Sequence, residues 1–299
     1  TSTQDITEMS TSFDVEEVEK PAGLLRTAIR LKRTQIGLGI LVFMIGLTIV
    51  GPIIAPHSQT AFIDMPNSLN IPGALFGTDY LGQDVWSRFL IGGQSILLLS
   101  ISATLLGTTV GTFLGLLAAI TKNKTDEFIM RIFDVILSFP QILLALLLVS
   151  MFDASPILTI LAVALSTMPR VGRIIRGAAL SVVERDFVQA ATALGESRMR
   201  ILFSEVLPNV TGPLLVEVSL RFTYSIATIA SLAFLGFAPD PTAANWGTMI
   251  QENSAVIVIQ PWGAVLPVIA IAVLTIGTGL CSDGLSRVLA GIDRGGKGE

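Results

Sequence analysis

The chain carries few residues that could do chemistry, and their types point to ion pairs rather than to catalysis. One His (His57) and one Cys (Cys281) among 299 residues exclude a His-based metal centre, a Cys-rich zinc site and an intramolecular disulfide. The sequence has no G-x-x-x-x-G-K-S/T phosphate loop, no H-E-x-x-H motif, no plausible Ser/His/Asp set and no basic surface with interleaved aromatics. We therefore expect no catalytic residue, no metal or cofactor bound by this chain, and no nucleic-acid partner.

One pair of opposite charges lies inside an apolar segment. Glu217 and Arg221 are four residues apart, which is the favourable order for an ion pair on a helix. Charged groups at membrane depth usually mark a transport pathway. Glu217, however, lies near the end of its segment, where a charged side chain can reach the membrane surface. The spacing predicts either a pathway contact or a structural ion pair.

A second group combines glycines with charges between the first two apolar segments: Gly77, Asp79, Gly82, Asp84 and Arg88. One interpretation is an outer loop that helps to form an external gate or contacts a partner protein. The other is a structural turn, in which the glycines adopt positive φ while the two Asp residues cap short helices or pair with Arg88.

Residues 184–209 contain their own helix start and stop signals. An apolar face recurs at i, i+3, i+4 and i+7 after Glu184 and comprises Phe187, Ala190, Ala191 and Leu194. Gly195 can end this helix in a left-handed conformation, Ser197 can cap a second helix, and Pro208 is expected to stop that one. Because a short loop cannot bury such a face, the pattern predicts a docking helix for another protein. The alternative is an amphipathic connector on the membrane surface.

The elements that must position these groups are membrane helices. Hydrophobic residues make up 51% of the chain and charged residues only 14%, against roughly 25% charged in an average soluble domain. A helix of about 20 apolar residues spans the bilayer core. The lack of strict apolar and polar alternation argues against a β-barrel. We predict an all-α integral membrane protein with six transmembrane helices, at roughly 35–55, 91–120, 131–151, 156–175, 213–235 and 262–283.

Small, cyclic and aromatic residues within these segments predict local features. A small-residue row on the second span, typical of a helix packing surface, is formed by Gly107, Gly111 and Gly115. Trp246 and Trp262 are expected in an aromatic belt at the outer membrane boundary. Bends are predicted at the prolines inside the spans, which are Pro140, Pro169 and Pro267.

The distribution of basic residues orients the spans. Seventeen of the nineteen Lys and Arg residues fall on one side of the six-span arrangement, and Arg88 and Arg221 are the exceptions. The positive-inside rule then predicts a multi-pass protein of the inner cell membrane with both termini in the cytoplasm. We divide the chain into an acidic disordered tail (1–22), a basic amphipathic helix at the membrane interface (23–34), a six-span domain (35–285) and a second cytoplasmic tail (286–299).

The loop sequence resembles a known family. The run Gln189-Ala-Ala-Thr-Ala-Leu-Gly195, followed by Leu207-Pro208, is similar to the EAA loop of ABC importer permeases. Further segments resemble the C-type subunit of the dipeptide, oligopeptide and nickel permeases, namely 76–88, 133–140, 231–237, 245–249 and 283–285. The Gly-Thr-Asp and Gly-Gln-Asp pattern within 76–88 indicates this branch of the family. The resemblance covers about residues 35–290.

The resemblance implies a type I ABC importer permease fold and a role as one transmembrane subunit of an ATP-driven importer of di- or oligopeptides. It implies a homologous second permease, an extracytoplasmic substrate-binding protein, and two ATPase subunits that bind ATP and Mg, all working by alternating access. The loop 184–209 would dock the ATPases through Glu184, Phe187, Gln189, Ala190, Ala191, Leu194, Gly195, Leu207 and Pro208.

Two residues depart from the family pattern in this loop. Gln189 stands where the family usually has a glutamate, so a neutral hydrogen bond replaces any ion pair at that position. Glu205 stands where the general pattern has an apolar residue. The resemblance still implies that the loop docks by its shape, but it implies no charge contacts at these two positions.

Two alternatives remain open from the sequence. The same permease could serve nickel, a metal chelate or an opine, because the partner binding protein selects the cargo in this family. A protein of a different class would be an intramembrane enzyme or a stand-alone channel. An intramembrane aspartyl protease would need two acidic residues deep in facing helices, whereas the best candidates here lie near span ends.

Overall fold

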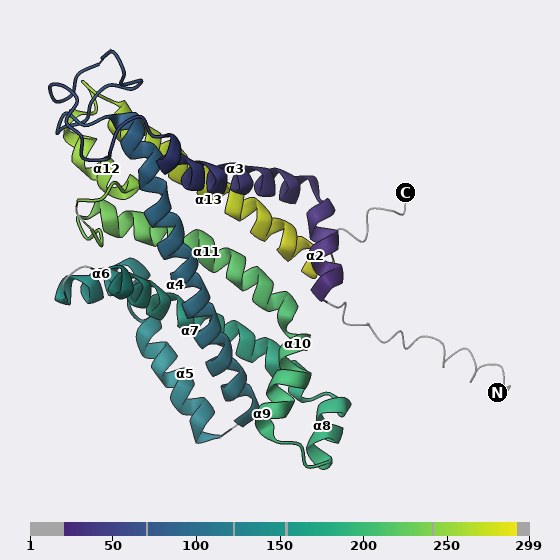
Figure 1. The fold of residues 1–299 in the computed structure, drawn as a ribbon. Helices are drawn as coiled ribbons and strands as arrows, with labels where there is room; N and C mark the ends of the chain where they lie inside the picture. The colour runs from purple at the N-terminus through teal and green to yellow at the C-terminus, as the bar shows by residue number, and fades with distance from the viewer. Residues whose placement is uncertain (1–20, 70, 122, 153–154, 241, 292–299) are drawn as a thin grey trace.

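The computed structural model describes residues 21–69, 71–121, 123–152, 155–240 and 242–291, and this part of the chain is built from helices (Figure 1). The long helices are α3 (Lys32–Ile54), α4 (Val85–Thr121), α7 (Pro156–Val183), α11 (Thr211–Phe234) and α13 (Trp262–Leu289). The short helices are α2 (Pro21–Arg30), α5 (Lys124–Leu137), α6 (Gln141–Met151), α8 (Asp186–Ala193), α9 (Arg198–Ile201), α10 (Leu207–Asn209) and α12 (Trp246–Asn253). A π turn covers Leu202–Val206 and a 3₁₀ turn covers Ser254–Val256.

The third predicted span is broken. Among the described residues, five helices are long and apolar enough to cross a membrane, and α5 with α6 adds a sixth crossing only as a pair bent by 87°. The span predicted over 131–151 is therefore a broken crossing, and the bend predicted at Pro140 lies at the break. Pro140 explains the break, because proline lacks an N–H and disfavours a helical conformation in the residue before it. Pro140 itself is extended, with ψ 132°, immediately before α6. The all-α, multi-span fold class is confirmed.

The long helix α4 connects the two ends of the molecule in Figure 1, with α12 at one end and α8, α9 and α10 at the other. Its glycine row packs against α7. A Cβ atom on Gly111 would lie 2.6 Å from the carbonyl oxygen of Met168, and one on Gly115 would lie 2.3 Å from that of Gly172. The predicted packing surface is confirmed, since only glycine allows the backbones to approach this closely.

Hydroxyl groups join the other long helices. Thr104 of α4 donates to Ser225 of α11 over 3.0 Å, and Thr223 of α11 donates to Thr278 of α13 over 2.8 Å. Side-chain hydrogen bonds of this kind hold helices together in an apolar environment, where little hydrophobic driving force acts between them.

Trp246 does not lie in an aromatic belt, contrary to the prediction. Its side chain is fully buried, and its indole N–H donates to the carbonyl of Phe89 over 2.8 Å. The space for the ring exists because α4 has glycine at positions 92 and 93. A Cβ on Gly93 would lie 2.3 Å from the indole. Trp262 is 39% exposed.

Candidate functional site

The 184–209 loop begins as the predicted helix, tight turn and second helix. Gly195 has φ +80°, and its N–H donates to the Thr192 carbonyl over 3.0 Å. The next N–H, of Glu196, reaches back to Ala191 over 3.2 Å, which closes the end of α8 with a left-handed glycine. The Ser197 hydroxyl accepts the Arg200 N–H over 3.3 Å and caps α9. The local structure of this turn is confirmed.

The second helix ends one residue after Pro208, at the predicted stop: α10 ends at Asn209, and Val210 (φ −105°, ψ 9°) separates it from α11. The chain passes from α9 through a π turn into α10, which contains Pro208, and then into α11. The N–H of Leu207 bonds to the carbonyl of Leu202, five residues back. The wider π turn lets the helix continue just before a residue that cannot donate a hydrogen bond.

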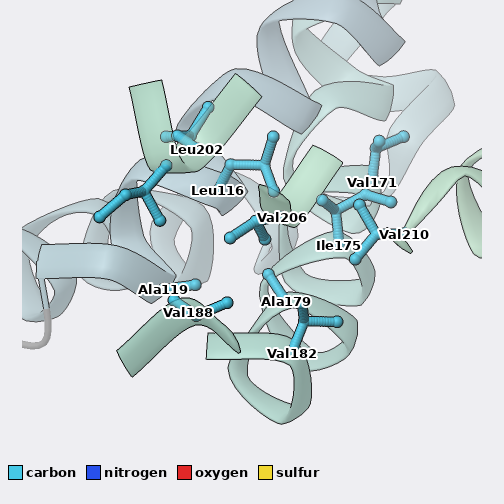
Figure 2. Close-up of a cluster of buried hydrophobic side chains, with 11 residues drawn as sticks. Leu116, Ala119, Val171, Ile175, Ala179, Val182, Val188, Leu202, Val206 and Val210 are labelled. Carbon is cyan, nitrogen blue, oxygen red and sulfur yellow. The ribbon is translucent and has the colours of Figure 1, made fainter. Parts of the chain in front are cut away.

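A buried base holds the loop against the membrane helices, as Figure 2 shows. Its loop side consists of Val188, Ile201, Leu202, Val206 and Val210, each no more than 3% exposed. Its helix side consists of Leu116 and Ala119 of α4 and Val171, Ile175, Ala179 and Val182 of α7. Sequence reasoning missed this base, although the spacing of four residues among Leu202, Val206 and Val210 was a usable signal.

The opposite side of the loop is open. Leu194 is 83% exposed, Phe187 is 39% exposed, and Ala190, Gln189 and Gly195 are exposed as well. Gln189 donates from its amide to the Glu184 carbonyl over 3.1 Å, so the residue that departs from the family pattern serves the loop's own backbone. The loop therefore presents apolar and small side chains outward from a base that is packed like a core.

At the other end of the molecule, Asp84 caps α4. Its carboxylate accepts the N–H of Trp86 over 3.1 Å and that of Ser87 over 3.3 Å. The same carboxylate lies 3.0 Å from the His57 ring nitrogen. This contact joins the segment that follows α3 to the start of α4. We call residues 55–84, together with α12, the cap.

Arg88, in the first turn of α4, packs against the cap and is 4% exposed. Its guanidinium contacts Asp79 and lies 3.0 Å from Glu252 on α12. Asp79 also accepts two backbone N–H groups, each over 2.9 Å, and Gly77 and Gly82 have φ +73° and +77°. The structure thus brings all five predicted residues of this group together in the geometry of the structural turn.

Residues far along the chain complete the cap. Burial raises the pKa of the Glu252 carboxyl group, against the opposing effect of Arg88, and burial likewise raises the pKa of the Tyr80 hydroxyl group beside Glu252. The Tyr80 N–H donates to Asn253 over 3.2 Å. Gln260 donates to two backbone carbonyls of the 55–84 segment over 2.8 and 3.0 Å. Sequence reasoning missed Glu252, Asn253 and Gln260, because nothing local links them to residues 76–88.

The charged groups in the spans form specific pairs. Glu217 and Arg221 on α11 are each 5% exposed, and their side chains approach within 3.1 Å. Arg173 of α7 pairs with Asp134 of α5. The expected Glu217–Arg221 ion pair is present. An arginine or an acidic residue at the centre of a lipid-facing helix costs about 2.5–3.5 kcal/mol on insertion scales, so such groups are expected to face protein or water.

The comparison with known sequences decides the family. Residues 111–291 match the family described as "Binding-protein-dependent transport system inner membrane component". The chain belongs to this family. The permease is 36% identical over 265 residues to the glutathione transport system permease protein GsiD of Shigella dysenteriae serotype 1 (strain Sd197), covering 87% of this chain and 88% of that protein. It is 32% identical over 287 residues to a protein of Brucella suis biovar 1 (strain 1330) named "Putative peptide transport system permease protein", covering 93% of this chain and 95% of that protein.

A solved structure agrees with the fold. An inward-facing form of the MetNI methionine ABC transporter superposes with a TM-score of 0.53 at 16% identity, covering 66% of the permease and 96% of that chain. The predicted ABC importer permease fold is confirmed. The permease is a multi-pass inner-membrane subunit of an ABC importer and belongs to a non-catalytic family. The hypothesis of an intramembrane enzyme is therefore wrong.

Proposed function

We propose that this permease forms half of the transmembrane pathway of a peptide importer and works by alternating access. The names of its relatives, a glutathione and a peptide transport permease, support a short peptide as the cargo. A homologous second permease would form the other half of the pathway, and an extracytoplasmic binding protein would deliver the peptide to the cap end. The nickel alternative predicts a different cargo for the same assembly.

One observation carries the coupling role: the 184–209 loop presents exposed Phe187 and Leu194 from a base that packs on α4 and α7. Two ATPase subunits, which bind ATP and Mg, would dock on this exposed face. Because the loop base is buried, a push on α8 is transmitted to both long helices rather than absorbed by a flexible linker. ATP-driven closure of the ATPases would then shift the spans between inward-open and outward-open packings.

The proposed topology places both termini and the 184–209 loop in the cytoplasm and the cap outside. The basic residues support this, because they concentrate in the segments assigned to the cytoplasm. Arg26 and Arg30 of α2 are exposed while Ala28 is buried, a pattern that suits a helix lying at the inner membrane surface.

The function is tested by uptake into proteoliposomes that contain the permease, its second permease, both ATPases and the binding protein. We expect ATP-dependent uptake of radiolabelled trialanine. Leu194→Asp, which places a charge on the exposed loop face, should abolish this uptake while the chain stays inserted. Uptake of nickel(II) in place of trialanine would assign the cargo to the alternative, and full uptake by an assembled Leu194→Asp complex would contradict the docking role.

A further inference from the structure

Four polar residues share one face of α11. Glu217, Arg221, Tyr224 and Thr228 follow one another at intervals of four, three and four residues, which places them in one row along a helix. The Arg221 guanidinium lies 5.0 Å from the centre of the Tyr224 ring. A row of this kind is unexpected on a membrane helix unless it faces protein or water.

Polar groups from two other helices meet this row. Gln141, the first residue of α6 after the break in the third span, donates to the Thr228 hydroxyl over 3.1 Å. Arg170 of α7 is close enough to Glu217 to interact electrostatically with its carboxylate. We call Gln141, Arg170, Glu217, Arg221, Tyr224 and Thr228 the polar wall.

Exposure decides what the polar wall faces. Arg170 is exposed although it lies midway along a span, and Tyr224 is 48% exposed in the middle of α11. A charged side chain in this position is costly against lipid hydrocarbon, so this side of the chain must face water or another protein in the assembly.

The charges of the polar wall select a ligand. Arg170 and Arg221 carry two positive charges against the single negative charge of Glu217. Arg221 is buried and its Nε lies 3.1 Å from the Glu217 carboxylate, whereas Arg170 is exposed. The exposed guanidinium of Arg170 beside an excess positive charge suits a carboxylate, which arginine binds through paired hydrogen bonds.

We infer that the polar wall lines the translocation pathway and that exposed Arg170 receives the free C-terminal carboxylate of the passing peptide. The inference rests on the proposed function and adds the substrate group that this subunit contacts. The exposed Arg170 guanidinium pairs with the peptide carboxylate, while buried Arg221 stays paired with Glu217 and against the Tyr224 ring. Glu217 keeps the net charge low, so that the carboxylate is bound weakly enough to leave.

Uptake by the complete reconstituted complex tests the ligand. We compare trialanine with trialanine amide, which lacks the carboxylate, in wild type, Arg170→Gln and the control Arg131→Gln, an exposed arginine paired with Glu127 on α5. Arg170→Gln should reduce uptake of trialanine about tenfold, as for the loss of one charge-assisted hydrogen bond. It should leave uptake of the amide within about twofold. An equal effect on both peptides, or none on either, would overturn the assignment. The ratio to wild type cancels any preference of the binding protein.

A second measurement tests whether the polar wall faces water, independently of the cargo. In a Cys281→Ala background, Tyr224→Cys should react with a charged, membrane-impermeant methanethiosulfonate in the assembled complex. The control Ile276→Cys, at a 57% exposed apolar position of α13, should not react. An inert Tyr224→Cys would overturn the polar wall even if peptide uptake is normal. A reactive Tyr224→Cys in a complex that takes up no peptide would instead refute the proposed cargo.

Discussion

Replacing Gly195 with alanine tests whether the turn after α8 must be rigid for coupling. Gly195 has φ +80°, and a Cβ atom there would meet nothing within 4 Å. The substitution therefore adds no clash and costs only the backbone strain of a left-handed non-glycine residue, about 1–2 kcal/mol. Such a cost raises the population of the open turn roughly 5- to 30-fold. The exposed docking side chains remain unchanged.

Hydrogen exchange and coupled transport measure this effect together. Amides of residues 186–206 should exchange roughly 5- to 30-fold faster in Gly195→Ala, and peptide uptake per ATP hydrolysed should fall. The matched control is Gly177→Ala, at an exposed position of α7 where a Cβ is equally free and φ is not positive. Alanine there should stabilise α7 by up to about 1 kcal/mol. Faster exchange with unchanged uptake per ATP would refute the claim that a rigid loop transmits the ATPase motion.

Three further substitutions test the packing and the cap. Gly115→Ala places a Cβ 2.3 Å from the Gly172 carbonyl, so it should destabilise the protein by about 1–3 kcal/mol, read as a lower thermal midpoint in detergent. Asp79→Asn removes a charged partner of buried Arg88 and should cost about 1.5–3 kcal/mol in the same assay. Burial raises the pKa of Glu252, so the folded cap binds this proton more tightly than the unfolded chain does. Lowering the pH should stabilise the cap, raising the pH through the elevated pKa should remove that contribution, and Glu252→Gln should flatten the dependence.

Matched controls accompany these measurements. Gly39→Ala adds a Cβ that meets nothing within 4 Å, and Asp283→Asn changes an exposed acid. Neither should lower the thermal midpoint. A drop in Gly39→Ala as large as in Gly115→Ala would contradict the close-packing argument. For the pH effect, exchange of residues 76–88 is compared after correction for intrinsic rates, and an unchanged slope in Glu252→Gln would show that another group titrates.

Most of the fold could be predicted from the sequence, because the features that determine the fold are local. Apolar length predicts the spans, glycine spacing predicts the contact between α4 and α7, and Gly195 with Ser197 predicts the turn between α8 and α9. The break at Pro140 also had a local signal. We predicted a bend there but kept one span, since membrane helices tolerate a proline when neighbouring groups satisfy the freed backbone.

The features that were missed depend on contacts between distant segments. Trp246 is buried because glycines on α4, far away in the sequence, leave space for its ring. Glu252 joins Arg88 only when α12 folds against the start of α4. Val188 points into the loop base rather than lying on the exposed face, since α4 and α7 supply the other half of that cluster. Helical periodicity identifies a face but does not say which neighbour covers it.

Cross-linking tests the central claim most directly, namely that the exposed face of the 184–209 loop docks an ATPase subunit. A single cysteine is introduced as Leu194→Cys in a Cys281→Ala background, and the assembled complex is treated with a short photoactivatable thiol reagent. Leu194 is 83% exposed, so the substitution leaves the buried loop base intact. We predict a covalent adduct between this position and the ATPase subunit, and none from Ile276→Cys on α13. A complex that hydrolyses ATP normally but gives no adduct at Leu194→Cys, or gives the same adduct from both positions, would contradict the account.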